Sequence, residues 1–147
     1  MAASSHQTDR SALVAARFGA RAAQYDEHAL LQRACAEGLA AFIDGHGGLP
    51  AQGLVAEIGC GTGLLSRLLA PRAQRYLTTD IAPEMVARCR QRLVDAPHAA
   101  FAVMDGETPA FSEAPAAIVS NLAAQWFGNP VAGLRRLARS RPCACRR

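Results

Sequence analysis

The chain has 147 residues, of which 50% are hydrophobic and 19% are charged, and a formal net charge of +4 in which every basic residue is Arg. This length fits one domain, and so apolar a composition excludes a chain that is disordered throughout. No apolar run reaches the roughly 18 residues that cross a bilayer, so we expect no membrane association, and the mild charge gives no reason to expect a nucleic-acid partner.

The first part of the chain has a helical pattern over residues 9–43. Its second half carries apolar side chains at three- and four-residue steps, as one face of a helix requires, namely Leu30, Leu31, Ala34, Cys35, Leu39 and Phe42. The Gly- and Pro-rich run over 45–50 then breaks the helix. We therefore assign residues 1–46 to an N-terminal helical region.

From residue 47 the chain alternates between short apolar strands and helices. This alternation indicates βαβ units and a parallel sheet, which define an α/β fold. The predicted strands cover 53–58, 75–79, 99–104 and 116–120, and the predicted helices cover 64–69, 83–94 and 130–139. Residues 47–139 form the predicted α/β domain, and residues 140–147 fit neither a strand nor a helix.

A glycine-rich motif follows the first of these strands, Glu57-Ile-Gly-Cys-Gly-Thr-Gly63. Glycines at every second position let a ligand approach the backbone closely, and the next helix directs unpaired N–H groups at it. Dinucleotide sites have their third glycine one place later, where this chain has Leu64. The acidic Glu57 favours a ligand with an ammonium and a sulfonium, which is S-adenosylmethionine (SAM). An ordinary strand-to-helix turn is the alternative.

Two further acids end the next two strands, Asp80 and Asp105. An acid placed like Asp80 binds ribose hydroxyls in βαβ nucleotide sites, although it could also cap the helix that begins at Pro83. Asp105, followed by Gly106, could meet an adenine edge or simply form an Asp-Gly turn. The three acids end successive parallel strands, at the edge where open α/β sheets bind ligands.

The cysteines give no sign of a metal site or of disulfides. The five cysteines are Cys35, Cys60, Cys89, Cys143 and Cys145. Their number is odd and their spacing matches no zinc pattern, because even the last pair is separated by one residue instead of two. The first ten residues lack the apolar core of a secretory signal. We therefore predict reduced thiols in a cytoplasmic protein without a metal.

These motifs resemble those of the class I SAM-dependent methyltransferases. The resemblance rests on the segments 57–63, 79–85 and 104–107. Within that superfamily, Ser120-Asn-Leu-Ala-Ala-Gln-Trp126 and the segment 18–25 are similar to the malonyl-[acyl-carrier protein] O-methyltransferases of biotin synthesis. The resemblance implies a Rossmann-like fold with strand order 3-2-1-4, an N-terminal helical lid, SAM as cofactor and a malonyl thioester on acyl-carrier protein as methyl acceptor.

The resemblance also implies roles for single residues. Glycines 59, 61 and 63 would shape the loop around the methionine part of SAM, and Glu57 would lie below it. Asn121 would lie near the transferred methyl group, and Tyr25 would belong to the lid. The full set of implied cofactor-binding residues is Glu57, Gly59, Cys60, Gly61, Gly63, Asp80, Ile81, Met85, Asp105, Gly106 and Asn121.

The end of the chain departs from this family. The family sheet continues beyond its fourth strand, whereas residues 140–147 look like a frameshifted or prematurely ended tail or a natural short variant. The strand 116–120 would then be an open edge, which invites pairing with other chains, so we expect poor solubility and no turnover from the chain as it stands. Another class I methyltransferase, such as one acting on quinone precursors, and a non-catalytic SAM-binding remnant remain alternatives. Half of a nicotinamide dehydrogenase is disfavoured by Leu64.

Overall fold

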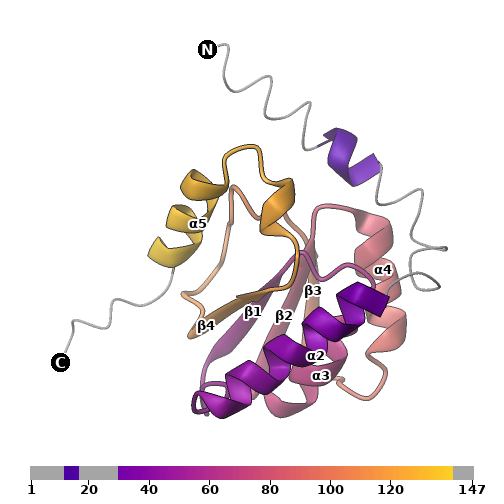
Figure 1. Ribbon diagram of the computed structural model, residues 1–147, viewed down its shortest axis with the longest axis vertical. Coiled ribbons are helices and arrows are strands. Elements are labelled where there is room, and N and C mark those ends of the chain that lie inside the picture. The colour runs from indigo at the N-terminus through magenta and orange to yellow at the C-terminus, as the bar shows by residue number, and fades with distance from the viewer. Residues whose placement is uncertain (1–11, 17–29, 141–147) are drawn as a thin grey trace.

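A parallel sheet of four strands forms the centre of the protein. The computed structural model describes residues 12–16 and 30–140. The strands are β1 (Leu54–Ile58), β2 (Arg75–Asp80), β3 (Ala99–Val103) and β4 (Ala117–Ser120). They lie in the order β3-β2-β1-β4, and every pair is parallel. The predicted α/β class and the strand order are confirmed (Figure 1).

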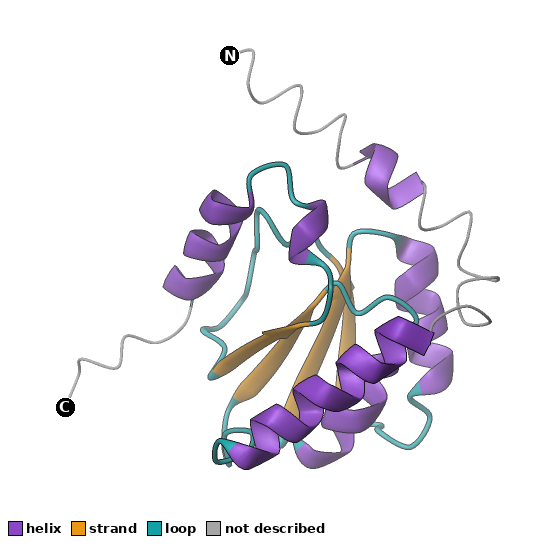
Figure 2. Cartoon of the chain, in the orientation of Figure 1, coloured by secondary structure: helices purple, strands orange, loops and turns teal. Residues whose placement is uncertain are grey.

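Helices connect and cover these strands (Figure 2). They are α2 (Leu30–Gly45), α3 (Leu64–Leu69), α4 (Pro83–Arg92) and α5 (Pro130–Arg139), with the short 3-10 turns η1 (Ala70–Arg72) and η2 (Ala124–Trp126). The α4 helix begins at its proline, as predicted, but it ends two residues before the predicted Val94, because Leu93 leaves the helical region with ψ at 41°. Neither 3-10 turn was predicted from the sequence.

The hydrophobic core lies between the sheet and the helices α2, α3 and α4, which Figure 1 shows together on one side of the molecule. The α2 helix contributes Ala36 and Ala40, and α3 contributes Leu65 and Leu69. Because α2 packs closely along α3, the described part of the N-terminal helical region belongs to the packed body of the protein. The α5 helix lies apart from these three helices, next to η2.

The central and outer strands differ in burial. All five residues of β1 are buried, and the strand has a neighbouring strand on each side. All four residues of β4 are only partly buried, and β4 is an outer strand of the sheet as described. Within the described ranges, no helix is long and apolar enough to cross a membrane.

The proposed division of the chain at residues 46 and 139 stays a prediction. The α2 helix ends at Gly45 and α5 ends at Arg139, so both boundaries fall at element ends. Tyr25 and the tail from residue 141 lie outside the described residues.

Candidate functional site

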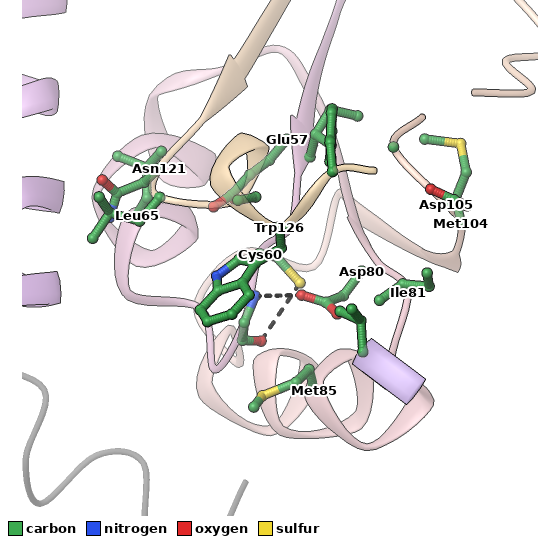
Figure 3. Close-up of a pocket in the computed structure, with 18 of the residues that line it drawn as sticks. Glu57, Cys60, Leu65, Asp80, Ile81, Met85, Met104, Asp105, Asn121 and Trp126 are labelled. Carbon is green, nitrogen blue, oxygen red and sulfur yellow. Dashed lines mark hydrogen bonds between the residues drawn. The ribbon is translucent and has the colours of Figure 1, made fainter. Parts of the chain in front are cut away.

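A pocket opens at the edge of the sheet where all four strands end. Its wall is formed by the loop after β1, by the residues that end β2 and β3, and by the segment after β4 (Figure 3). The pocket brings together ten of the eleven residues implied as cofactor-binding, all except Gly63, namely Glu57, Gly59, Cys60, Gly61, Asp80, Ile81, Met85, Asp105, Gly106 and Asn121.

The three glycines of the loop have different surroundings, although all three have positive φ. A Cβ on Gly59 would lie 2.2 Å from the Cβ of Ala123, so the segment after β4 lies directly on this glycine. A Cβ on Gly63 would lie 2.9 Å from Sγ of Cys89 in α4. A Cβ on Gly61 would have nothing within 4 Å. Gly59 and Gly63 therefore allow close packing within the protein, while Gly61 leaves open space in the pocket.

Asp80 ties the glycine loop to the start of α4. Its Oδ2 accepts a hydrogen bond from the Gly61 N–H at 2.8 Å, and its Oδ1 accepts one from the Ala82 N–H at 2.9 Å. Burial raises the pKa of Asp80, and the hydrogen bonds from backbone N–H groups partly oppose this rise. Asp80 is not itself the N-cap residue of α4, which is Ala82, but its carboxylate accepts the N–H of that residue.

The carboxyl group of Glu57 points into the core. Its Oε2 accepts hydrogen bonds from Ser66 Oγ at 2.5 Å and from the Tyr76 hydroxyl at 2.9 Å. Burial raises the pKa of Glu57 to about 8, although the hydrogen bond from Ser66 lowers it in part. The side chain is therefore mostly neutral near neutral pH, and it joins α3 to β2. The sequence contained no signal for its partnership with Tyr76.

Two buried thiols lie at the base of the loop. A hydrogen bond with Cys89, followed by burial, raises the pKa of the Cys60 thiol. The Cys89 Sγ also contacts Ser66 Oγ at 3.4 Å. Because only the thiolate is a strong nucleophile, Cys60 is suited to packing beside the loop and not to covalent chemistry.

The segment after β3 forms a turn, which is one of the two roles that the sequence left open for Asp105. Its Oδ1 accepts a hydrogen bond from the Glu107 N–H at 2.9 Å. Glu107 was not predicted as a site residue, yet it lines the pocket and its two carboxylate oxygens accept hydrogen bonds from the Gly128 and Asn129 N–H groups. This carboxylate holds the connection between η2 and α5 against the end of β3.

The segment after β4 closes the pocket on its other side. Ser120 Oγ donates to the Ile58 carbonyl at 2.9 Å, and Asn121 Nδ2 donates to the Gln32 carbonyl of α2 at 3.3 Å. Leu122 has a φ of 58°, the left-handed region that side chains other than glycine rarely adopt. Trp126 and Phe127 also line the pocket. The sequence marked this segment only as a family motif and did not predict a role for its aromatic residues.

Comparisons with known proteins agree with this geometry. The family described as "Methyltransferase domain" matches residues 55–140. The bifunctional biotin-biosynthesis protein BioCD of Bordetella avium is 46% identical over 134 residues, which cover 89% of this chain and 28% of that protein. The malonyl-[acyl-carrier protein] O-methyltransferase of Magnetococcus marinus is 40% identical over 133 residues, which cover 88% of this chain and 48% of that enzyme.

The structural comparison gives the same fold. A SAM-bound amino pentose methyltransferase from Micromonospora echinaspora superposes with a TM-score of 0.64 at 22% identity, over 82% of this chain and 50% of that one. The chain belongs to the methyltransferase-domain family, and its fold is that of the class I SAM methyltransferases. It spans about half the length of the Magnetococcus enzyme, and a smaller share of the Bordetella protein.

Proposed function

We propose that this chain binds SAM and belongs to a cytoplasmic protein that methylates the free carboxylate of a malonyl thioester carried by acyl-carrier protein. The observation that carries the proposal is the pocket itself, in which the glycine loop, Asp80 and Asp105 meet at the carboxyl ends of three neighbouring strands. This is the edge at which open α/β sheets bind nucleotide-like ligands.

The described residues fit SAM. The open space at Gly61 is room that a Cβ would take from a ligand, and the neighbouring Asp80 carboxylate is an acceptor of the kind that ribose hydroxyls need. Asp105 and Gly106 line the same pocket at the end of β3, where the adenine is expected. When bound, SAM would supply a methyl group on a positively charged sulfur.

The chain's own residues would act by holding the reactants and excluding water. An acceptor carboxylate is already ionised near neutral pH, so the reaction needs no general base, and Cys60 has a raised pKa that keeps its thiol protonated. Placing two reactants in line is worth roughly 7–11 kcal/mol of the barrier. Asn121 joins the end of β4 to α2, and this link would hold the acceptor side of the pocket in place.

The choice of acceptor rests on the two biotin-synthesis relatives. Their names specify a malonyl-[acyl-carrier protein] O-methyltransferase and a bifunctional biotin-biosynthesis protein. The segment from Ser120 to Trp126, which resembles that family, forms one wall of the pocket. This placement supports a role for the segment at the acceptor side.

Calorimetry on the full chain tests both halves of the proposal. We expect SAM and its demethylated product S-adenosylhomocysteine (SAH) to bind. Malonyl-acyl-carrier protein should then bind to the SAH-saturated chain more tightly than acetyl-acyl-carrier protein, which lacks the carboxylate that would be methylated. Absence of SAM and SAH binding would overturn the whole proposal, and equal affinity for the two carrier proteins would overturn the acceptor.

An assay with methyl-labelled SAM adds a test of turnover. Label in malonyl-acyl-carrier protein, but not in the acetyl form, would support the proposed reaction and would contradict our expectation that the chain as it stands is inactive. Transfer to a quinone precursor instead would favour another class I methyltransferase. Cofactor binding with neither acceptor bound nor labelled would favour a SAM-binding chain without catalysis.

A further inference from the structure

Acidic side chains line the pocket, but their hydrogen bonds within the protein do not explain how it would recognise a positively charged sulfur. The sequence pointed to Glu57, but its carboxyl oxygen Oε2 accepts hydrogen bonds from Ser66 and Tyr76 inside the core. Both oxygens of Asp80 accept backbone N–H groups, and so do both oxygens of Glu107. Each of these three acids therefore holds parts of the protein together, and Glu57, whose raised pKa keeps it mostly neutral, is a weak partner for a positive charge.

An aromatic residue, Trp126, lies in the same wall of the pocket as Asn121, which the resemblance places near the transferred methyl group. Ala123 lies on Gly59 of the loop, and the Trp126 N–H donates to the Ala123 carbonyl at 3.0 Å, so η2 begins at this contact. Trp126 is therefore one short turn away from the glycine loop. Figure 3 labels Trp126 among the residues that line the pocket, together with Asn121, Asp80 and Cys60.

The two aromatic residues of this wall differ in their packing. Phe127 fills the space left by two glycines, since a Cβ on Gly106 or Gly133 would lie within 2.9 Å of its ring. Trp126 keeps 41% of its surface exposed while lining the pocket. Tryptophan is the side chain whose ring face attracts a cation most strongly.

We infer that Trp126 recognises the positive charge of the methyl donor through the face of its indole ring. This inference rests on the proposed function, because it takes SAM as the ligand of the pocket. It assigns charge recognition to the wall after β4 and leaves Glu57 as a residue of the core. Trp126 is then a binding residue that distinguishes the charged donor from its neutral product.

Ligand pairs that differ in charge test this role. Calorimetry should compare SAM, the neutral thioether SAH and sinefungin, which has an ammonium near the position of the sulfonium. We expect Trp126→Leu to weaken binding of SAM and sinefungin by roughly three- to thirtyfold, with a much smaller effect on SAH. Trp126→Phe, which keeps a ring face, should retain most of the preference for SAM.

Phe127→Leu is the matched control, since it removes a neighbouring ring that also lines the pocket. We expect it to change SAM and SAH affinity by the same factor, and circular dichroism would show that each variant is folded. An unchanged ratio of SAH to SAM dissociation constants in Trp126→Leu would overturn the inference. Failure of the wild-type chain to bind either ligand would instead overturn the proposed function, so the two failures are distinguishable.

Fluorescence gives an independent measurement, because Trp126 is the only Trp in the sequence. Its emission should change as SAM saturates the site, with the midpoint that calorimetry gives. Emission that stays constant while calorimetry reports SAM binding would show that the ring does not contact the ligand, and would overturn the inference as well.

Discussion

The two sides of the pocket are built differently. On the side of β1 and β2, Glu57 and Asp80 are buried, and each accepts two hydrogen bonds from groups of other elements. On the side of β4 the strand is only partly buried, Leu122 has an unfavourable positive φ and Trp126 is partly exposed. Strain of this kind persists where the surrounding structure imposes it, often at functional sites. The side of β1 and β2 is therefore held by buried hydrogen bonds, whereas the side of β4 carries local backbone strain.

The largest loss of stability should come from the contact between Gly59 and Ala123, where the two sides of the pocket meet. Gly59→Val would place a branched side chain at a φ of 68°, with its Cβ 2.2 Å from Ala123. Strain and overpacking together should lower the free energy of unfolding by roughly 4 kcal/mol or more. Urea denaturation would measure this loss.

Gly61→Ala is the control for that variant. Its φ is 53° and a Cβ there meets nothing within 4 Å, so the loss of stability should be about 1 kcal/mol, while the new methyl group occupies ligand space and weakens SAM binding. Similar losses of stability in the two variants would contradict the view that Gly59 joins the two sides.

The buried carboxyl group should make stability depend on pH. Folding raises the pKa of Glu57 from 4.5 to about 8, so the unfolded chain releases this proton at lower pH than the folded one. The stabilisation is fully present below about pH 4.5 and is lost as pH rises through about 8, by roughly 4 kcal/mol between about pH 5 and pH 9.

Glu57→Gln isolates this contribution. The amide oxygen can still accept from Ser66 and Tyr76 but cannot ionise. We expect the difference in unfolding free energy between variant and wild type to grow in favour of the variant as pH rises. A difference that stays constant across this range would show that Glu57 does not titrate in the core.

Asp80 should matter to both the loop and the ligand. Asp80→Ala leaves the N–H groups of Gly61 and Ala82 without their carboxylate partner, which should cost about 1–3 kcal/mol of stability. SAM binding should weaken as well, which calorimetry would measure. The exposed Glu84 in the next helix is the control, because Glu84→Ala should change neither quantity. Unchanged SAM affinity in Asp80→Ala would remove this residue from the site.

The smallest effect is expected at an ion pair on the surface. Arg72 Nη2 and Asp44 Oδ1 are 2.7 Å apart, and their side chains are 41% and 54% exposed. Exposed pairs of this kind contribute at most about 1 kcal/mol. The midpoint of thermal unfolding of Asp44→Ala should therefore differ little from that of wild type. A large decrease in this midpoint would show that the exposed ion pair contributes to stability as strongly as the buried hydrogen bonds do.

The local pattern of the sequence was enough to predict most of the secondary structure and a parallel sheet, whereas the strand order came from the resemblance to a known family. From residue 53 onward, apolar runs, the glycine motif and Pro83 placed the predicted elements to within about two residues, because alternation of strands and helices and the breakers between them are local signals. The exceptions are the two 3-10 turns, which depend on contacts made after the chain has folded. Because parallel strands all end at one edge of the sheet, the position of the pocket was also predictable.

The partners of the side chains were decided only by the tertiary structure. Glu57 and Tyr76 are far apart in the sequence, and only the pairing of β1 with β2 beside α3 brings them together. In the same way, the absence of a side chain at Gly63 makes room for Cys89, and its absence at Gly59 makes room for Ala123. A sequence shows which residue types can bind a ligand, but burial and competing hydrogen bonds determine which of them face it.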